Sequence, residues 1–148
     1  MKKTILAMAM MLTVGLTGAF AKDNEGVSKK ISSSFSKDFV TAKNVSWNSQ
    51  KEYSKATFTL NNQVMFAYYN ETGDLIATAR NILSEQLPIN LLTSLKKDFS
   101  KYWISELFEL AADGQTSYYV TLQNGDETLI LKSNNFNEWY TYKKIRKI

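Results

Sequence analysis

The stretch "VSKKISSSFSKDF" (27–39) lines up without gaps on a second stretch, "LPINLLTSLKKDF" (87–99), and both end in Lys-Asp-Phe. Each stretch carries an apolar residue at every fourth position, which is the spacing of one face of an α-helix. These positions are Val27, Ile31, Phe35 and Phe39 in the first stretch, and Leu87, Leu91, Leu95 and Phe99 in the second. Such internal self-similarity predicts that one structural unit occurs twice along the chain.

The segments after each helical stretch carry apolar residues at every second position, as half-buried β-strands do. Ala56, Phe58 and Leu60 follow this pattern in the first half, and Tyr118, Val120 and Leu122 follow it in the second. Turn signals separate the strands, and Asn124-Gly125 is the strongest of them. The sequence therefore predicts an α+β fold of two tandem repeats, each one helix followed by about four antiparallel strands, with the helices on one face of the sheet or sheets.

The first residues have the features of a signal peptide. Lys2 and Lys3 precede a mostly apolar run (5–16), and Ala19-Phe20-Ala21 gives the small-x-small pattern of a cleavage site. The run is too short to span a bilayer, and no cysteine is available for lipid attachment. We expect a signal peptide over 1–21, cleavage after Ala21, and a periplasmic or secreted protein with no membrane insertion afterwards.

The rest of the chain divides at one short connection. We assign 22–80 to the first helix-plus-sheet repeat, 81–86 to the connection and 87–148 to the second repeat. No low-complexity linker separates the halves, and each half alone is near the size at which a hydrophobic core becomes marginal. We therefore expect 22–148 to form one compact domain.

Composition excludes several classes of chemistry. The chain has no cysteine and no histidine, which removes disulfides, thiol nucleophiles and Ser-His or Cys-His systems. Glu106 and Glu109 lie on opposite sides of a predicted strand, and Asp126-Glu127 lies in a turn, so both acid pairs are interpreted as solvated. We expect no catalytic residue, no metal site and no cofactor. An enzyme working with carboxylates alone would need two or more acids converging in one cleft.

The charge pattern does not favour a nucleic-acid partner. The formal net charge of the whole chain is +4, and the only cluster of basic residues is the tail, 143–147. The simplest interpretation of this tail is the solvated end of a strand. The oligomeric state is left open.

Several motifs carry a resemblance to a known family. They are "AKNVSW" (42–47), "NETGDL" (70–75) and a second helix that begins "LP" (87–88). The chain resembles the PepSY-like, beta-lactamase-inhibitor-like secreted proteins common in Bacteroidetes, over roughly 27–142. "SNNFNEW" (133–139) departs from the pattern, because Phe136 or Asn137 occupies the place where a glycine is usual.

The resemblance implies an αβ tandem in which both helices cover one side of a sheet whose other side can be concave. It implies little about activity, because the family name rests on fold similarity to an inhibitor, and a fold does not transfer function. The loop by which such an inhibitor would plug an enzyme has no identifiable counterpart here, so no inhibitory residue is carried over.

Aromatic residues on the predicted strands are the candidate binding residues. Assigning the strand faces by the repeat places a polar, tyrosine-rich set away from the helices, with the composition of a protein-contact surface. The candidate binding residues are Met65, Tyr69, Tyr119, Ile130, Tyr140 and Tyr142. The competing interpretation is that these aromatics reflect strand propensity and cross-strand pairing and belong to the core.

The leading hypothesis is a non-enzymatic secreted or periplasmic binding module. It would dock a protein partner, with an extracellular hydrolase bound in an inhibitor-like manner as one candidate, through the open sheet face or the hairpin loops. The alternative is a binder of a small ligand, peptide or envelope glycan in a groove between the repeats. A deep pocket lined by Trp139, Tyr140 and Tyr119 would favour that alternative.

Overall fold

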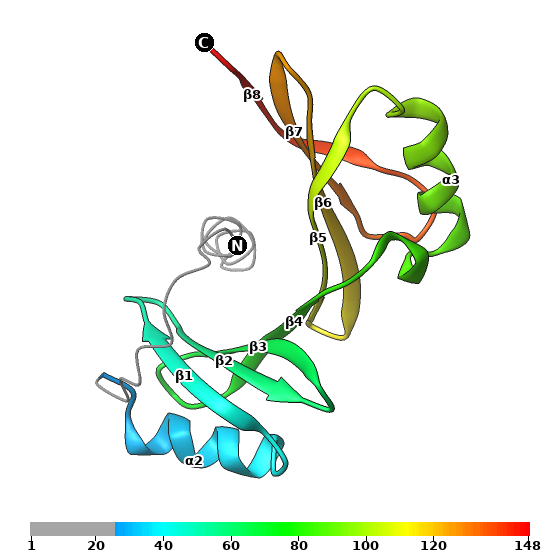
Figure 1. The fold of residues 1–148 in the computed structure, drawn as a ribbon. Coiled ribbons are helices and arrows are strands. Elements are labelled where there is room, and N and C mark those ends of the chain that lie inside the picture. Colours follow the sequence, from blue (N-terminus) through cyan, green and yellow to red (C-terminus); the bar gives the residue numbers. More distant parts are fainter. Residues whose placement is uncertain (1–25) are drawn as a thin grey trace.

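In the computed structural model, which describes residues 26–148, the chain forms one eight-stranded antiparallel sheet and two α-helices. Each strand pairs with its neighbours along the chain, in the order β1 to β8. The elements are α2 (Lys29–Asp38), β1 (Lys43–Ser49), β2 (Ser54–Leu60), β3 (Gln63–Tyr69), β4 (Leu75–Asn81), the 3₁₀ turn η1 (Ser84–Gln86), α3 (Ile89–Asp98), β5 (Trp103–Ala112), β6 (Gln115–Gln123), β7 (Glu127–Ser133) and β8 (Tyr140–Arg146). The sheet is strongly curved, and the helices lie on its outer side (Figure 1).

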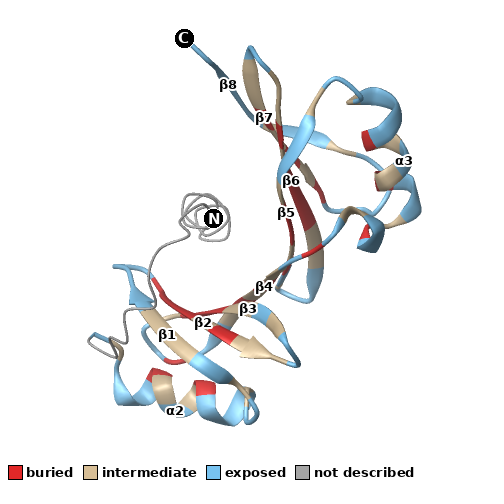
Figure 2. Cartoon of the chain, in the orientation of Figure 1, coloured by how far each residue is buried: buried red, intermediate tan, exposed pale blue. Residues whose placement is uncertain are grey.

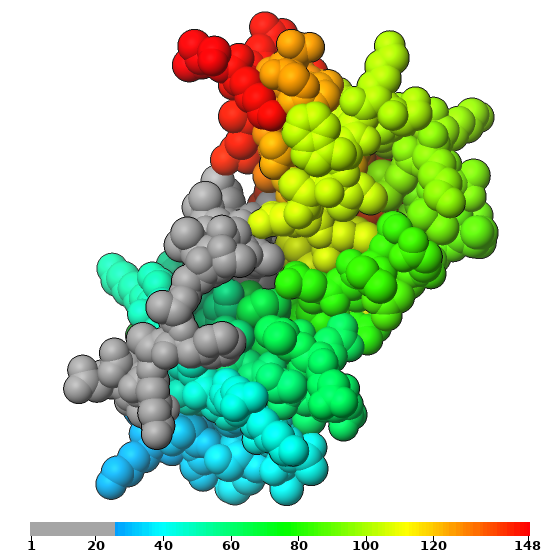
Figure 3. Space-filling view, viewed as in Figure 1, coloured from blue at the N-terminus to red at the C-terminus, as the bar shows by residue number. Residues whose placement is uncertain are grey.

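The predicted fold class, two tandem repeats of one helix and about four antiparallel strands, is wrong. Strand β4 pairs with β5 across the expected boundary, from Ala77 opposite Ala112 to Asn81 opposite Phe108, so the chain builds one continuous sheet. An unpaired strand edge presents a row of unsatisfied backbone groups, and this pairing removes the two edges that separate units would have had there. In the space-filling view, residues near 70–85 join the two ends of the molecule without a break (Figure 3).

The helices form where the fourfold spacing predicted them. In α2 the Ser28 hydroxyl accepts a hydrogen bond from the Ile31 N–H at 3.2 Å, which satisfies one of the free donors at the helix start. Ile31 and Phe35 are buried in α2, and Leu91 and Leu95 are buried in α3. The repeated Lys-Asp-Phe marks the helix ends, since Phe39 and Phe99 are the C-cap residues.

Both helices pack on the same face of the sheet and divide that face into two cores. Under α2, the Phe35 ring lies 4.9 Å from the Phe58 ring and 5.3 Å from the Trp47 ring, measured between centroids. Under α3, Leu91 packs with Val120 and Leu131. Buried residues accordingly gather on the central strands and on the sides of the helices that face the sheet (Figure 2). The inward alternation predicted for β2 and β6 is confirmed.

Two-residue turns fix the register of the hairpins. Asn61 and Asn62 both adopt positive φ, so Leu60 pairs directly with Gln63. Asp113 and Gly114 do the same, and Ala112 pairs with Gln115. Phe136, at the place where the sequence departs from the family pattern, also has a positive φ of 63°.

The structure bears on localisation in one respect. Within 26–148, neither helix is long and apolar enough to cross a membrane. The predicted signal peptide, 1–21, and its cleavage site lie outside the described residues.

Candidate functional site

The candidate site is the sheet face opposite α2 and α3, which no helix in the described part of the chain covers (Figure 1). We call it the helix-free face. It carries aromatic side chains from strands β3, β5, β6 and β8 and from the turn before β2. This aromatic band consists of Tyr53, Phe66, Tyr68, Phe108, Tyr119 and Tyr142.

The rings of the aromatic band contact one another in two groups. Phe108 and Tyr119 are cross-strand partners, and their rings stack 4.9 Å apart at an interplanar angle of 9°. Tyr142 meets Tyr119 edge-on, with 6.0 Å between the centroids. In the other group, Tyr53 meets Tyr68 at 5.6 Å. Such pairs favour offset or edge-to-face geometry, which gives the band a fixed shape.

Small residues of β4 separate the two groups of rings. Ala77 pairs with Tyr68 of β3 and with Ala112 of β5, and Ala79 pairs with Phe66 and Leu110. Because Ala77 and Ala79 carry only methyl groups, the larger aromatic side chains lie on either side of β4. The helix-free face is thus apolar along its middle strands.

Two lysines place their ammonium groups over the aromatic band. Lys55 Nζ lies 4.5 Å from the centroid of the Phe66 ring, and Lys132 Nζ lies 5.2 Å from that of Tyr119. An ammonium group over a ring face is attracted by the ring quadrupole. Lys55 is only 7% exposed, and burial lowers the pKa of its amine.

Tyr119 carries the one buried side-chain polar atom of residues 26–148 that lacks a hydrogen-bond partner, its hydroxyl oxygen. The residue is 1% exposed, and burial raises its pKa to about 12. Buried hydroxyl groups are almost always hydrogen-bonded, so the Tyr119 hydroxyl is an exception among the described residues.

The sheet divides the six predicted binding residues between its two faces. Tyr119, Ile130, Tyr140 and Tyr142 lie on the helix-free face, and their exposure increases outward from Tyr119 at 1% to Tyr140 at 51%. Met65 and Tyr69 lie instead on the face covered by α2. The Tyr69 hydroxyl donates a 2.8 Å hydrogen bond to Asp38 of that helix. Tyr69 is therefore part of the core under α2.

Sequence reasoning missed five residues of the helix-free face, namely Tyr53, Lys55, Phe66, Tyr68 and Phe108. The signal for three of them was present. A two-residue turn at Asn61-Asn62 pairs Leu60 with Gln63, which places Phe66 and Tyr68 on the face opposite Phe58. The turn at Asp113-Gly114 places Phe108 opposite Tyr119 in the same way.

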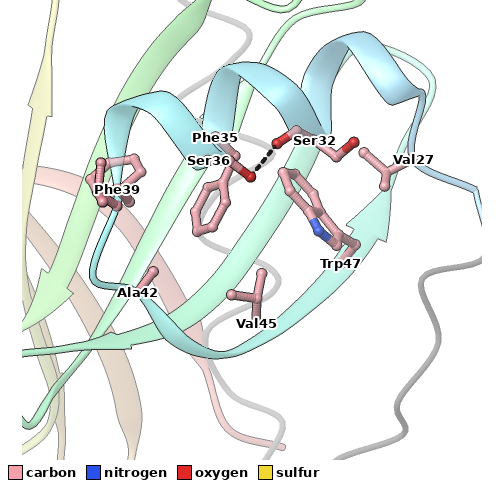
Figure 4. Close-up of a pocket in the computed structure, with 9 residues that line it drawn as sticks. Val27, Ser32, Phe35, Ser36, Phe39, Ala42, Val45 and Trp47 are labelled. Carbon is pink, nitrogen blue, oxygen red and sulfur yellow. Dashed lines mark hydrogen bonds between the residues drawn. The ribbon is translucent and has the colours of Figure 1, made fainter.

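Two open pockets lie on the other face, each between a helix and the strand that follows it. The first has a volume of about 460 Å³ and lies between α2 and β1, where Phe35, Phe39 and Trp47 form its floor (Figure 4). The second, of about 310 Å³, lies between α3 and β5 and includes Leu95, Phe99 and Tyr102. Both are lined largely by residues that already belong to the cores.

The acidic residues do not converge. Glu106 accepts a hydrogen bond from the Thr121 hydroxyl, whereas Glu109 forms a 3.0 Å ion pair with Arg80 on the face that α2 and α3 occupy. No group of three or more acidic side chains in 26–148 is arranged to hold a metal ion. The Trp139 indole donates to the Leu91 carbonyl under α3, so Trp139 and Tyr119 lie on opposite faces and line no common pocket.

Comparisons with known proteins agree on the fold. The sequence matches no family profile and no curated protein. Among solved structures, the chain is similar to a DUF2874 family protein from Bacteroides uniformis, with a TM-score of 0.73 and 11% identity over 82% of this chain and 90% of that one. It is also similar to a BLIP-like protein from Bacteroides fragilis, with a TM-score of 0.71 and 15% identity over 82% and 89%. A third match, provisionally described as periplasmic, is from Bacteroides eggerthii, with a TM-score of 0.72 and 11% identity over 82% and 89%.

At these identities the likeness shows the fold alone. The chain therefore has the fold of BLIP-like and DUF2874 family proteins of Bacteroides. The finer name given by the sequence resemblance, PepSY-like, is not confirmed by any of these matches.

Proposed function

We propose that this protein is a non-enzymatic binding module of the periplasm or cell exterior that docks another protein on its helix-free face. The observation that carries the proposal is the aromatic band, which runs across the helix-free face and includes a buried hydroxyl with no partner. Tyrosines on a rigid scaffold are typical anchors of protein interfaces. The predicted signal peptide and the fold shared with a BLIP-like protein support the same proposal.

The face offered to the partner has a buried centre and a more exposed outer part. The centre, with Tyr68 and Tyr119, is a preformed apolar floor, and the outer strands carry half-exposed or exposed Ile130, Tyr140 and Tyr142. The partner would contact these outer residues first, while the buried rings of the floor hold the outer strands in a fixed shape. A hydrolase held in an inhibitor-like manner is the finer form of the proposal. The groove-binding alternative loses its main support, because Trp139 and Tyr119 lie on opposite faces.

Site-specific photo-crosslinking tests the proposal. A photo-reactive phenylalanine derivative replaces Tyr142 in the full chain, which is produced and exported by the cells that normally make it. We expect a discrete adduct with another protein, and excess unlabelled protein should suppress it. The matched control places the same group at Lys97, which is exposed on α3. No adduct from position 142, or equal adducts from both positions, would refute docking on the helix-free face.

A further inference from the structure

Lys55 occupies an unusual position in the helix-free face. It is the second residue of β2, opposite Tyr68, and its ammonium group is 4.5 Å from the Phe66 ring centroid and 5.9 Å from the Tyr68 ring centroid. At 7% exposure it is the most buried charged residue of the described chain. Among residues 26–148 it has no acidic partner, since the ion pairs formed there join Arg80 to Glu109 and Lys144 to Glu127.

An unpaired buried ammonium group is costly for a folded protein. Removing a charge from water is unfavourable unless a partner compensates it, and ring faces compensate only in part. Most lysines avoid this cost by extending the side chain into solvent. Lys55 instead keeps its ammonium group against the Phe66 and Tyr68 rings, and only 7% of the residue is exposed. The arrangement would be explained if an anionic group completes it in a complex.

Two further lysines lie on the helix-free face. Lys132 lies over Tyr119, and Lys143 is paired with Ile130 on the same side of the sheet. Along β2 to β8 the acidic residue on this face is Glu106, which the Thr121 hydroxyl already contacts. A second copy of this chain would bring like charges together, which disfavours it as the occupant. Charge complementarity favours an acidic partner.

We propose that the protein docked on the helix-free face presents a loop whose Asp or Glu carboxylate binds the Lys55 ammonium group between the Phe66 and Tyr68 rings. This proposal rests on the proposed function and adds the chemistry of the partner. The rings supply the apolar walls of the subsite, and Lys55 supplies its single charge. Apolar or aromatic residues beside the acid in the loop contact the neighbouring rings.

The test uses a defined probe, a display library of disulfide-closed heptapeptides selected on the mature chain. The best peptide is synthesised together with an analogue in which its acid is replaced by the matching amide. Affinities are measured by calorimetry for the wild type, Lys55→Met, Lys55→Arg and the surface control Lys97→Met. We expect the selected peptides to carry an acidic residue. Lys55→Met alone and the amide analogue alone should each weaken binding by about 30-fold or more. The two losses should not add when combined.

The controls separate binding from folding. Lys55→Met should melt at the same or a higher temperature than the wild type, because it removes an unpaired buried charge and keeps the apolar stem. Lys55→Arg should retain the preference for the acid, and Lys97→Met should match the wild type throughout. A lower melting temperature for Lys55→Met would mean that its contact with the rings is structural, and would overturn the proposal.

The binding outcomes distinguish the two proposals. Peptides that shift the resonances of Phe66 and Tyr68 but show no preference for an acid overturn the role of Lys55 and leave protein docking intact. If no peptide is enriched, or enriched peptides map to the helix side, docking on the helix-free face fails as well. Self-association of the wild type through Tyr142, measured by sedimentation, would replace the acidic partner with a second copy.

Discussion

Replacing Phe35 by alanine should destabilise the whole molecule, including strands that Phe35 does not touch. Phe35 is 5% exposed and lies at the centre of the core under α2, with four aromatic rings between 4.9 and 6.4 Å from its own. Truncating a buried phenylalanine costs about 3–5 kcal/mol. Because the neighbouring rings are large and cannot easily fill the cavity, we expect about 4 kcal/mol, or about a 10³-fold lower ratio of folded to unfolded protein.

Native-state hydrogen exchange measures how far this loss spreads. Since β4 pairs with β5, the sheet has no internal boundary at which the first four strands could unfold alone. The slowest amides of β6 should therefore lose the same protection factor as those of β2. Phe35→Leu is the matched control, because leucine stands at the corresponding position of α3, and it should cost about 1.5 kcal/mol or less. Unchanged protection in β6 beside lost protection in β2 would refute the reasoning.

Three further predictions concern single positions. Gly73 has a φ of +83°, and atoms of Lys30 and Ser34 lie 3.2 Å from the position of an added Cβ, so Gly73→Ala should lower the free energy of unfolding by about 2 kcal/mol. Gly114 has a φ of +73° but lies in open space, so Gly114→Ala should lower it by about 1 kcal/mol in the same urea titration. Equal losses would show that the contact with α2 is not tight. Tyr119→Phe should raise the free energy of unfolding by about 1 kcal/mol or more, since it removes a buried hydroxyl without a partner; a decrease would reveal a hidden hydrogen bond. Burial raises the Tyr119 pKa to about 12 from the usual 10, so its neutral form stabilises the fold at lower pH. This contribution should be lost as the pH rises from about 10 through 12, as measured by melting temperature beside tyrosinate absorbance, and a flat profile would contradict it.

The sequence was sufficient for the helices and for most strand faces. A spacing of four identified Ile31, Phe35, Leu91 and Leu95 as buried helix positions, and the structure confirms them. Two-residue turns at Asn61-Asn62 and Asp113-Gly114 also contained the register that places Phe66, Tyr68 and Phe108 on the helix-free face. The same register places Met65 and Tyr69 on the face of Phe58, under α2, and not on the helix-free face as the sequence interpretation had them.

Other features of the structure could not be predicted from the local sequence pattern. The pairing of β4 with β5 joins residues about thirty positions apart, and Ala77 and Ala79 give little indication of which strand lies beside them. Register shifts between Tyr68 and Tyr69 and between Ile130 and Leu131 change the alternation locally. The burial of Lys55 depends on the Phe66 and Tyr68 rings lying beside its ammonium group, which is a tertiary property.

The strict sequential order of the strands has a consequence for how the chain reaches this structure. Every strand from β1 to β8 pairs with the strands next to it along the chain, so each pairing closes a comparatively short loop. Folding rates rise as contacts become more local, because less chain entropy is lost before each contact forms. We therefore expect the chain to fold faster than a sheet of the same size in which neighbouring strands are distant along the chain.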